Sequence, residues 1–100
     1  MRGAVRLPRK IITEFCSRHH IVRLCLYGSV LTSAFGPQSD IDVLVEFEPG
    51  HIPGLLRLSA MENELSALLG RKVDLRTPQD LSRYFRDEVL AAAEVQYAQG

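Results

Sequence analysis

The sequence predicts a small α/β domain of the α+β type, in which helices flank a mixed sheet of three strands. Three observations lead to this fold class. Segments of helical and strand periodicity alternate along the chain in the order α-β-α-β-α-β-α. A chain of 100 residues has room for one domain, expected to span residues 1–100. Its 46% hydrophobic and 24% charged residues are ordinary for a globular protein, so extensive disorder and collagen-like repeats are excluded.

The first predicted helix covers residues 8–20, because apolar side chains recur there on one helical face and Pro8 suits a first helical turn. The apolar residues of this face are Ile11, Ile12, Phe15 and Cys16. Residues 21–27 follow as a β-rich strand with Val22, Leu24 and Leu26 on one face. Residues 30–35 have room for one or two helical turns, and residues 36–39 have the composition of a turn.

The strongest predicted strand is DIDVLVEF, residues 40–47, in which Ile41, Val43 and Val45 point to one face. A loop rich in Pro and Gly separates it from an amphipathic helix over residues 55–69, which Gly70 is expected to end. The predicted buried stripe of that helix consists of Leu58, Met61, Leu65, Leu68 and Leu69.

The third predicted strand is residues 72–76, and a last helix begins directly after it. Thr77 is its expected N-cap, Pro78 its first residue, and Asp80 lies in its first turn. The inner face of this helix is predicted to consist of Leu81, Tyr84, Phe85, Val89 and Ala92. The second strand, the long helix and the third strand form a crossover unit, which predicts that these two strands are parallel.

Charge and cysteine content restrict the function classes. The 12 basic residues balance the 12 acidic ones, which argues against a general nucleic-acid binder and against direct DNA binding. A net charge of zero favours association, with a partner or as a homo-oligomer. No apolar run follows the basic N-terminus and none is long enough to span a membrane, so a soluble cytoplasmic protein without a membrane partner is expected.

Cys16 and Cys25 are predicted to be reduced core thiols. Together with His19 and His20 they do not have the spacing of a common zinc site. His51 lies in the Pro/Gly loop and is expected to be solvated.

Three carboxylates are candidates for a metal site. Asp is depleted in strand interiors, yet Asp40 and Asp42 occupy positions i and i+2 of the strongest strand and therefore point to the same face. Like charges so close repel one another unless a cation lies between them. If the second and third strands are parallel neighbours, Asp74 reaches the same face. Three carboxylates around one or two Mg²⁺ ions are an arrangement used for phosphoryl or nucleotidyl transfer.

Gly28 and Ser29 follow the first strand and are candidates for phosphate binding. Glycine permits close backbone approach, and free N–H groups at the start of the next helical turn attract phosphate. If this pair and the Asp40/Asp42 pair serve one nucleotide, the end of the first strand must lie beside the start of the second. The first two strands are then antiparallel, and the sheet is mixed.

Each feature alone also has an ordinary structural explanation. An Asp-x-Asp pair at a strand start often forms a solvated turn, and a Gly-Ser pair after a strand is often only a turn. Asp74 has the surface partners Arg71, Lys72 and Arg76 within three residues. The joint pattern of all three features is what favours a nucleotide site.

The segment LYGSVLTSAFGPQSDIDVLVEF resembles the G-S-x10-D-x-D signature of the DNA polymerase β-like nucleotidyltransferases. Chain length and the ending GRKVDLRTPQDLSRYFRDEVL are similar to the minimal nucleotidyltransferases, the antitoxin partners of HEPN-domain toxins. The resemblance implies a small mixed sheet flanked by helices. It also implies that Gly28 and Ser29 bind the triphosphate and that Asp40 and Asp42 ligate Mg²⁺. Asp74 would complete the metal site or take the proton of the attacking hydroxyl.

The reaction that the resemblance implies is transfer of AMP from ATP to a hydroxyl, in characterised pairs a tyrosine of the HEPN toxin. Many members carry Arg four residues after the motif glycine, where this chain has Thr32. Arg23, Arg76 or a cation of the partner are the candidate replacements. Two alternatives stay open: an antitoxin that neutralises its partner by binding alone, and nucleotidyl transfer to a small molecule or an RNA end.

Overall fold

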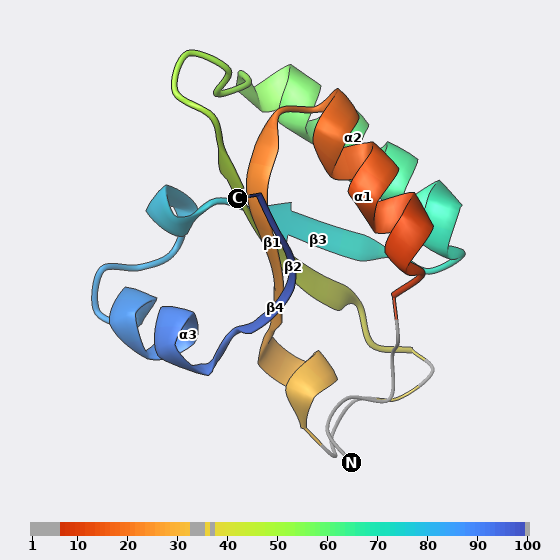
Figure 1. The fold of residues 1–100 in the computed structure, drawn as a ribbon. Coiled ribbons are helices and arrows are strands. Elements are labelled where there is room, and N and C mark those ends of the chain that lie inside the picture. The colour runs from red at the N-terminus through yellow and green to blue at the C-terminus, as the bar shows by residue number, and fades with distance from the viewer. Residues whose placement is uncertain (1–6, 33–35, 37, 100) are drawn as a thin grey trace.

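The computed structural model describes residues 7–32, 36 and 38–99, and its elements alternate around one sheet (Figure 1). In chain order they are α1 (Arg9–Arg18), β1 (Ile21–Tyr27), the 3-10 turn η1 (Gly28–Leu31), β2 (Ile41–Phe47), α2 (Leu55–Leu69), β3 (Val73–Arg76), the 3-10 turn η2 (Pro78–Asp80), α3 (Arg86–Ala92) and β4 (Glu94–Ala98). The predicted turn over residues 30–35 is confirmed as far as Leu31, and residues 33–35 lie outside the described part of the chain.

The sheet has the strand order β3-β2-β1-β4. Strand β1 runs antiparallel to β2, and β2 runs parallel to β3, which confirms the mixed sheet predicted from the sequence. The predicted number of strands was wrong, because β4 pairs antiparallel with the free edge of β1 and makes a fourth.

Helices α1 and α2 lie on the same side of the sheet in Figure 1, and the hydrophobic core lies beneath them. Ile41, Val43 and Val45 of β2 all point into this core, as their alternation predicts. In β1 the register shifts between Ile21 and Arg23, so Ile21 is buried there in place of the predicted Val22. Cys16 and Cys25 are both buried and free, as predicted.

Two predictions about helix packing were wrong. Leu68 of α2 is 41% exposed, whereas Met61 and Leu65 fill the predicted stripe. The predicted last helix is broken: η2 ends at Asp80, and α3 begins only at Arg86. As a result Tyr84 and Phe85, which were expected on an inner face, are 76% and 60% exposed. The predicted apolar face ran from Leu81 to Ala92, but α3 begins only at Arg86. The apolar residues before Arg86 are therefore not on a shared helical face with those of α3.

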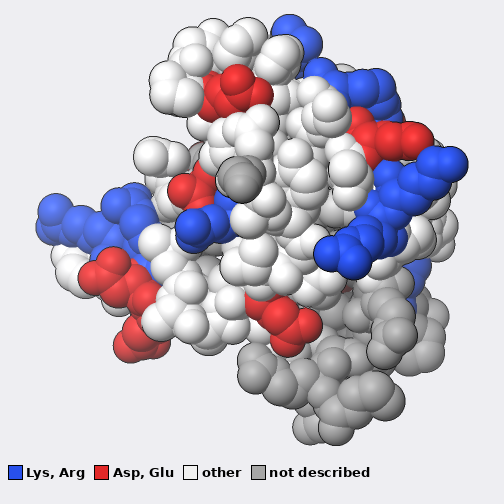
Figure 2. Space-filling view, viewed as in Figure 1, with Lys and Arg blue, Asp and Glu red and all other residues white. Residues whose placement is uncertain are grey.

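Charges of both signs are interspersed on the face of the molecule seen in Figure 2, with uncharged surface between them. Among the described residues of this face, Lys and Arg side chains therefore have acidic side chains near them. Within the described residues, no helix combines the length and the apolar character that a membrane crossing needs.

Candidate active site

Neighbouring strands bring three polar side chains into one row across the sheet. In the register of the sheet, Tyr27 at the end of β1 is the partner of Asp42 in β2, and Asp42 is the partner of Asp74 in β3. Adjacent strands are about 4.8 Å apart, and paired residues point to the same face. The two carboxylates therefore lie side by side on the face that α1 and α2 leave uncovered. The predicted meeting of Asp42 and Asp74 is confirmed.

Asp42 is the electrostatic centre of this row. Its pKa is raised above the ordinary carboxyl value, first by partial burial and then by the negative charges of Asp74 and Asp40. Arg76 and a hydrogen bond from the Ser29 backbone N–H act in the opposite direction. A carboxylate that is crowded by two others gains most from a bound cation, so the chemistry of this donor set fits Mg²⁺.

Gly28 makes the close approach on which this arrangement depends. Its φ of +74° is in the left-handed region, which residues with a Cβ rarely adopt. A Cβ placed on Gly28 would lie 2.5 Å from Oδ2 of Asp42. Glycine is therefore required here for its backbone conformation and because the Asp42 carboxylate lies directly against it. The turn also directs the backbone N–H of Ser29 toward that carboxylate.

Thr32 ends this turn, at the position where the resemblance noted in the sequence leads one to expect arginine. Its hydroxyl and its backbone N–H both donate to the carbonyl oxygen of Ser29, each at 2.9 Å. The side chain thus closes the 3-10 turn. Among the candidate replacements, Arg23 lies at the other end of β1 beside Glu46, whereas Arg76 lies at the site.

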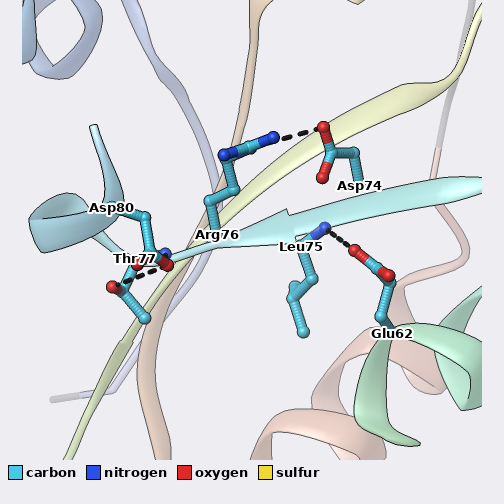
Figure 3. Close-up of polar contacts among 6 residues, drawn as sticks. All are labelled: Glu62, Asp74, Leu75, Arg76, Thr77 and Asp80. Carbon is cyan, nitrogen blue, oxygen red and sulfur yellow. Dashed lines mark hydrogen bonds and ion pairs between the residues drawn. The ribbon is translucent and has the colours of Figure 1, made fainter. Parts of the chain in front are cut away.

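Arg76 pairs with Asp74 across one strand pleat (Figure 3), with 3.3 Å between Nε and Oδ2. This contact confirms one of the three surface partners considered for Asp74. Next to it, the backbone N–H of Thr77 donates to Oδ2 of Asp80, so the predicted cap of the following turn is confirmed. Asp74 thus lies between Asp42 on the neighbouring strand and the Arg76 guanidinium on its own strand.

Asp40 precedes β2 and is exposed. The loop before it is fixed by Arg71, whose Nη2 donates to the carbonyl oxygens of Gly36 and Ser39 at 2.8 Å each. Arg71 therefore orients the entry to β2 and does not pair with Asp74. Of the five predicted site residues, the structure brings Gly28, Ser29, Asp42 and Asp74 into direct proximity and places Asp40 at the rim.

Two further residues contribute to the site: Tyr27, which the sequence places directly before Gly28 and which was expected to pack near the nucleotide, and Glu62, which was not singled out from the sequence. Tyr27 belongs to the row, and partial burial together with Asp42 and Asp74 raises its pKa to about 12, so its hydroxyl keeps its proton at neutral pH. Glu62 of α2 accepts a 2.7 Å hydrogen bond from the backbone N–H of Leu75 (Figure 3). No local sequence signal marks Glu62, because its partner is the free edge of a strand 13 residues later.

Strand β3 is an edge strand, and α2 supplies acceptors for two of its outward N–H groups. Glu62 accepts from Leu75, and Oγ of Ser66 accepts from Val73 at 2.9 Å. Val73 and Leu75 flank Asp74 in β3. The two hydrogen bonds therefore fix the position and direction of the strand segment that carries the Asp74 carboxylate.

Replacing Glu62 with Ala is expected to lower the free energy of unfolding by about 1–2 kcal/mol, because a half-buried edge N–H loses a charged acceptor. Urea unfolding measures this change. The neighbouring exposed variant Asn63→Ala is the control and should stay within about 0.5 kcal/mol of the parent chain. Equal stability of the two variants would show that the bond to β3 contributes nothing.

Two cavities adjoin the row. One of about 700 Å³ is bounded by Tyr27, Gly28, Leu31 and Thr32 on one side and by Glu88, Val89 and Ala92 on the other. A second, of about 300 Å³, lies beside Asp74 and is also lined by Glu62, Arg76 and Asp80. The first has the size of a small-molecule site and is lined by the Gly28 turn.

Comparison with known proteins agrees with this geometry. Residues 8–95 match the Nucleotidyltransferase domain family. A candidate protein adenylyltransferase from Methanocaldococcus jannaschii is 34% identical over 87% of this chain and 90% of its own length.

Two solved structures share the fold. The structure of a candidate minimal nucleotidyltransferase superposes with a TM-score of 0.69 at 34% identity, covering 87% of this chain and 85% of that one. A chain from the structure of the tri-AMPylated Shewanella oneidensis HEPN toxin in complex with MNT antitoxin has a TM-score of 0.67 at 17% identity, covering 91% of this chain and 70% of that chain. The fold, the row of carboxylates beside a Gly-Ser turn and the family match lead to one conclusion: the chain belongs to the nucleotidyltransferase domain family.

Proposed function

We propose that this protein is an antitoxin that transfers AMP from ATP to a tyrosine hydroxyl of a partner HEPN toxin. The modification silences the toxin. The observation that carries the proposal is the placement of Asp42 and Asp74 side by side against the Gly28–Ser29 turn. A relative named as a candidate adenylyltransferase and a structural neighbour solved with an AMPylated HEPN toxin support the choice of reaction and partner.

In this proposal Gly28 and Ser29 bind the triphosphate, and the cavity of about 700 Å³ beside them receives the nucleoside. Asp40, Asp42 and Asp74 would hold Mg²⁺, which when bound neutralises charge on the phosphates and on the departing pyrophosphate. The raised pKa of Asp42 supports this role, because a cation relieves the repulsion that causes part of the shift.

The transfer forms a bond between the acceptor oxygen and the α-phosphorus and breaks the bond from that phosphorus to the bridging oxygen of pyrophosphate. The proton of the acceptor hydroxyl passes to a carboxylate, for which Asp74 at the edge of the row is our candidate. Arg76, 3.3 Å from Asp74, supplies positive charge near the phosphates in place of the arginine that Thr32 replaces.

The surface supports a protein partner. Several large apolar side chains are more than half exposed: Ile52, Leu55, Leu56, Tyr84, Phe85 and Val95. Contiguous exposed apolar groups mark interaction surfaces, and three of these residues, Ile52, Leu55 and Leu56, come from one stretch of five residues. The acceptor hydroxyl would then be delivered by the partner, since the described residues are largely used to build the sheet, its covering helices and the nucleotide half of the site.

The proposal is tested by toxin neutralisation. The toxin is incubated with ATP, Mg²⁺ and either the parent chain or the Asp40→Asn plus Asp42→Asn variant, and its toxic activity is then assayed after the two proteins are separated. We expect lasting inactivation with the parent chain alone. If the toxin regains its activity once it is separated from the parent chain, the protein acts by binding and the transfer proposal fails. Equal lasting inactivation by the double variant would show that Asp40 and Asp42 are not needed, and would contradict the proposal as well.

A further inference from the structure

We infer that His20, Glu48 and His51 form a second metal site, which takes a divalent transition-metal ion such as Zn²⁺ and is separate from the three aspartates. Among the described residues these three form a group whose candidate ligand atoms all lie within 4.8 Å of one another. Two imidazole nitrogens and one carboxylate oxygen are a ligand set that zinc uses, with water as the fourth ligand.

The backbone holds the three residues together before any ion binds. The N–H of Glu48 donates to the carbonyl oxygen of His20 at 2.9 Å, and the N–H of His51 donates to the carbonyl oxygen of Glu48 at 3.0 Å. Pro49 and Gly50 lie between Glu48 and His51 and follow the residue pattern of a type II turn, in which Gly50 has a φ of +83°. Residues 28 positions apart in the chain are thereby kept as neighbours.

The side chains already converge. Nδ1 of His20 is 3.6 Å from Oε2 of Glu48, and the rings of His20 and His51 stack with centroids 3.8 Å apart. Ligand atoms around a tetrahedral zinc ion lie roughly 3.3 Å from one another, given bonds of about 2.0–2.1 Å. Small rotations of the exposed His51 and the half-buried His20 and Glu48 side chains therefore close the set around an ion. Both imidazoles also line a cavity of about 350 Å³, from which water can supply the fourth ligand.

His20 adopts a φ of +58°, which is costly for a residue with a Cβ and is seen nowhere else among the described non-glycine residues. This conformation joins α1 to β1 and sets the ring of His20 over that of His51. His19, directly before it, instead contacts Glu64 through Nε2 at 2.9 Å. The two adjacent histidines thus belong to different clusters.

The site lies at the end of the sheet opposite the aspartates. His20 precedes the start of β1, while Tyr27 at its other end is the partner of Asp42. The six residue-to-residue steps from Ile21 to Tyr27 span about 20 Å. In Figure 1 the loop that follows β2 is at the top of the sheet and η1 is at the bottom. An ion bound here would tie the start of β1 to the loop after β2 without occupying the transfer site.

The test titrates Zn²⁺ into the full chain against a chromophoric chelator at pH 7.5 with excess Mg²⁺, and follows the histidine ring resonances by NMR. We expect one ion per chain, a shift of the His20 and His51 resonances, and a rise in Tm of a few degrees. His51→Ala, at an exposed position, and His20→Asn, which keeps a residue that tolerates positive φ, should each weaken binding at least about tenfold.

His19→Gln is the matched control and should bind zinc like the parent chain. The Asp42→Asn variant should do the same, which separates this site from the aspartates. The inference is overturned if the parent chain shows no saturable zinc binding, or if zinc leaves the ring resonances of His20 and His51 unchanged. Equal affinity in the His51→Ala and His20→Asn variants would overturn it as well.

Discussion

Replacing Asp42 with Asn is expected to reduce AMP transfer at least about 10³-fold while the protein stays folded. Asp42 is the middle residue of the row, between Tyr27 and Asp74, and its carboxylate is the one that both Asp74 and Asp40 crowd. Asparagine keeps the size of the side chain and an oxygen for the Ser29 N–H, but it removes the charge that a divalent cation requires. Initial rates of label transfer from ATP to the toxin measure the effect, and a loss of less than tenfold would contradict the assigned role.

The same substitution is expected to make the metal-free protein more stable near neutral pH. The pKa of Asp42 is raised in the folded state, so the folded protein binds the carboxyl proton more tightly than the unfolded chain does. Protonation of Asp42 therefore stabilises the fold at low pH, and this stabilisation is lost as pH rises through the raised pKa. Below the ordinary carboxyl value of about 3.8 the parent chain and the variant should have the same Tm. Toward pH 7 the variant should unfold at the higher temperature, and a lower Tm of the variant there would refute the assigned direction.

Replacing Gly28 with Ala has the second-largest expected effect. The left-handed backbone at φ +74° costs about 1–2 kcal/mol for a residue with a Cβ. In addition, the new methyl group would meet Oδ2 of Asp42 at 2.5 Å and displace that carboxylate. A displacement of about 1 Å at a reacting centre costs on the order of 100-fold in rate. We expect both losses, measured by urea unfolding and by the transfer assay.

Gly70→Ala separates the two causes. Gly70 ends α2 with a φ of +69°, close to that of Gly28, but a Cβ there would meet nothing within 4 Å. This control should lose a similar free energy of unfolding and keep the parent rate. If Gly28→Ala also keeps the parent rate, the contact between Gly28 and Asp42 has no role in the reaction.

The parts of the fold that the sequence predicts correctly are those set by strong local patterns. The alternation in residues 40–47 predicts both the strand and its core face, and the crossover through α2 predicts the parallel pairing that brings Asp42 and Asp74 together. Strand β4 was missed because Glu94–Ala98 follows three alanines, which favour helix. Its strand conformation depends on the free edge of β1, which no local pattern reveals.

The candidate site shows the same division. Gly28, Ser29 and the aspartates were identified because their spacing along the chain is itself a motif. The reason why residue 28 must be glycine cannot be read from the spacing of the motif. A Cβ at this position would collide with Oδ2 of Asp42, which lies on the neighbouring strand. Glu62 and the His20–Glu48–His51 group were not predicted, because both depend on the register of the sheet and on the loops at its ends.

The most direct test of the central claim compares ATP labelled at the α-phosphate with ATP labelled at the γ-phosphate. Each is incubated with Mg²⁺, the partner HEPN toxin and this protein, and the label retained on the toxin is measured. Transfer of AMP predicts that the α label stays on the toxin and that the γ label leaves as pyrophosphate. With the Asp40→Asn plus Asp42→Asn variant, the toxin should retain no α label and no labelled pyrophosphate should form. Retention of the γ label, or no retained label in either reaction, would contradict the account.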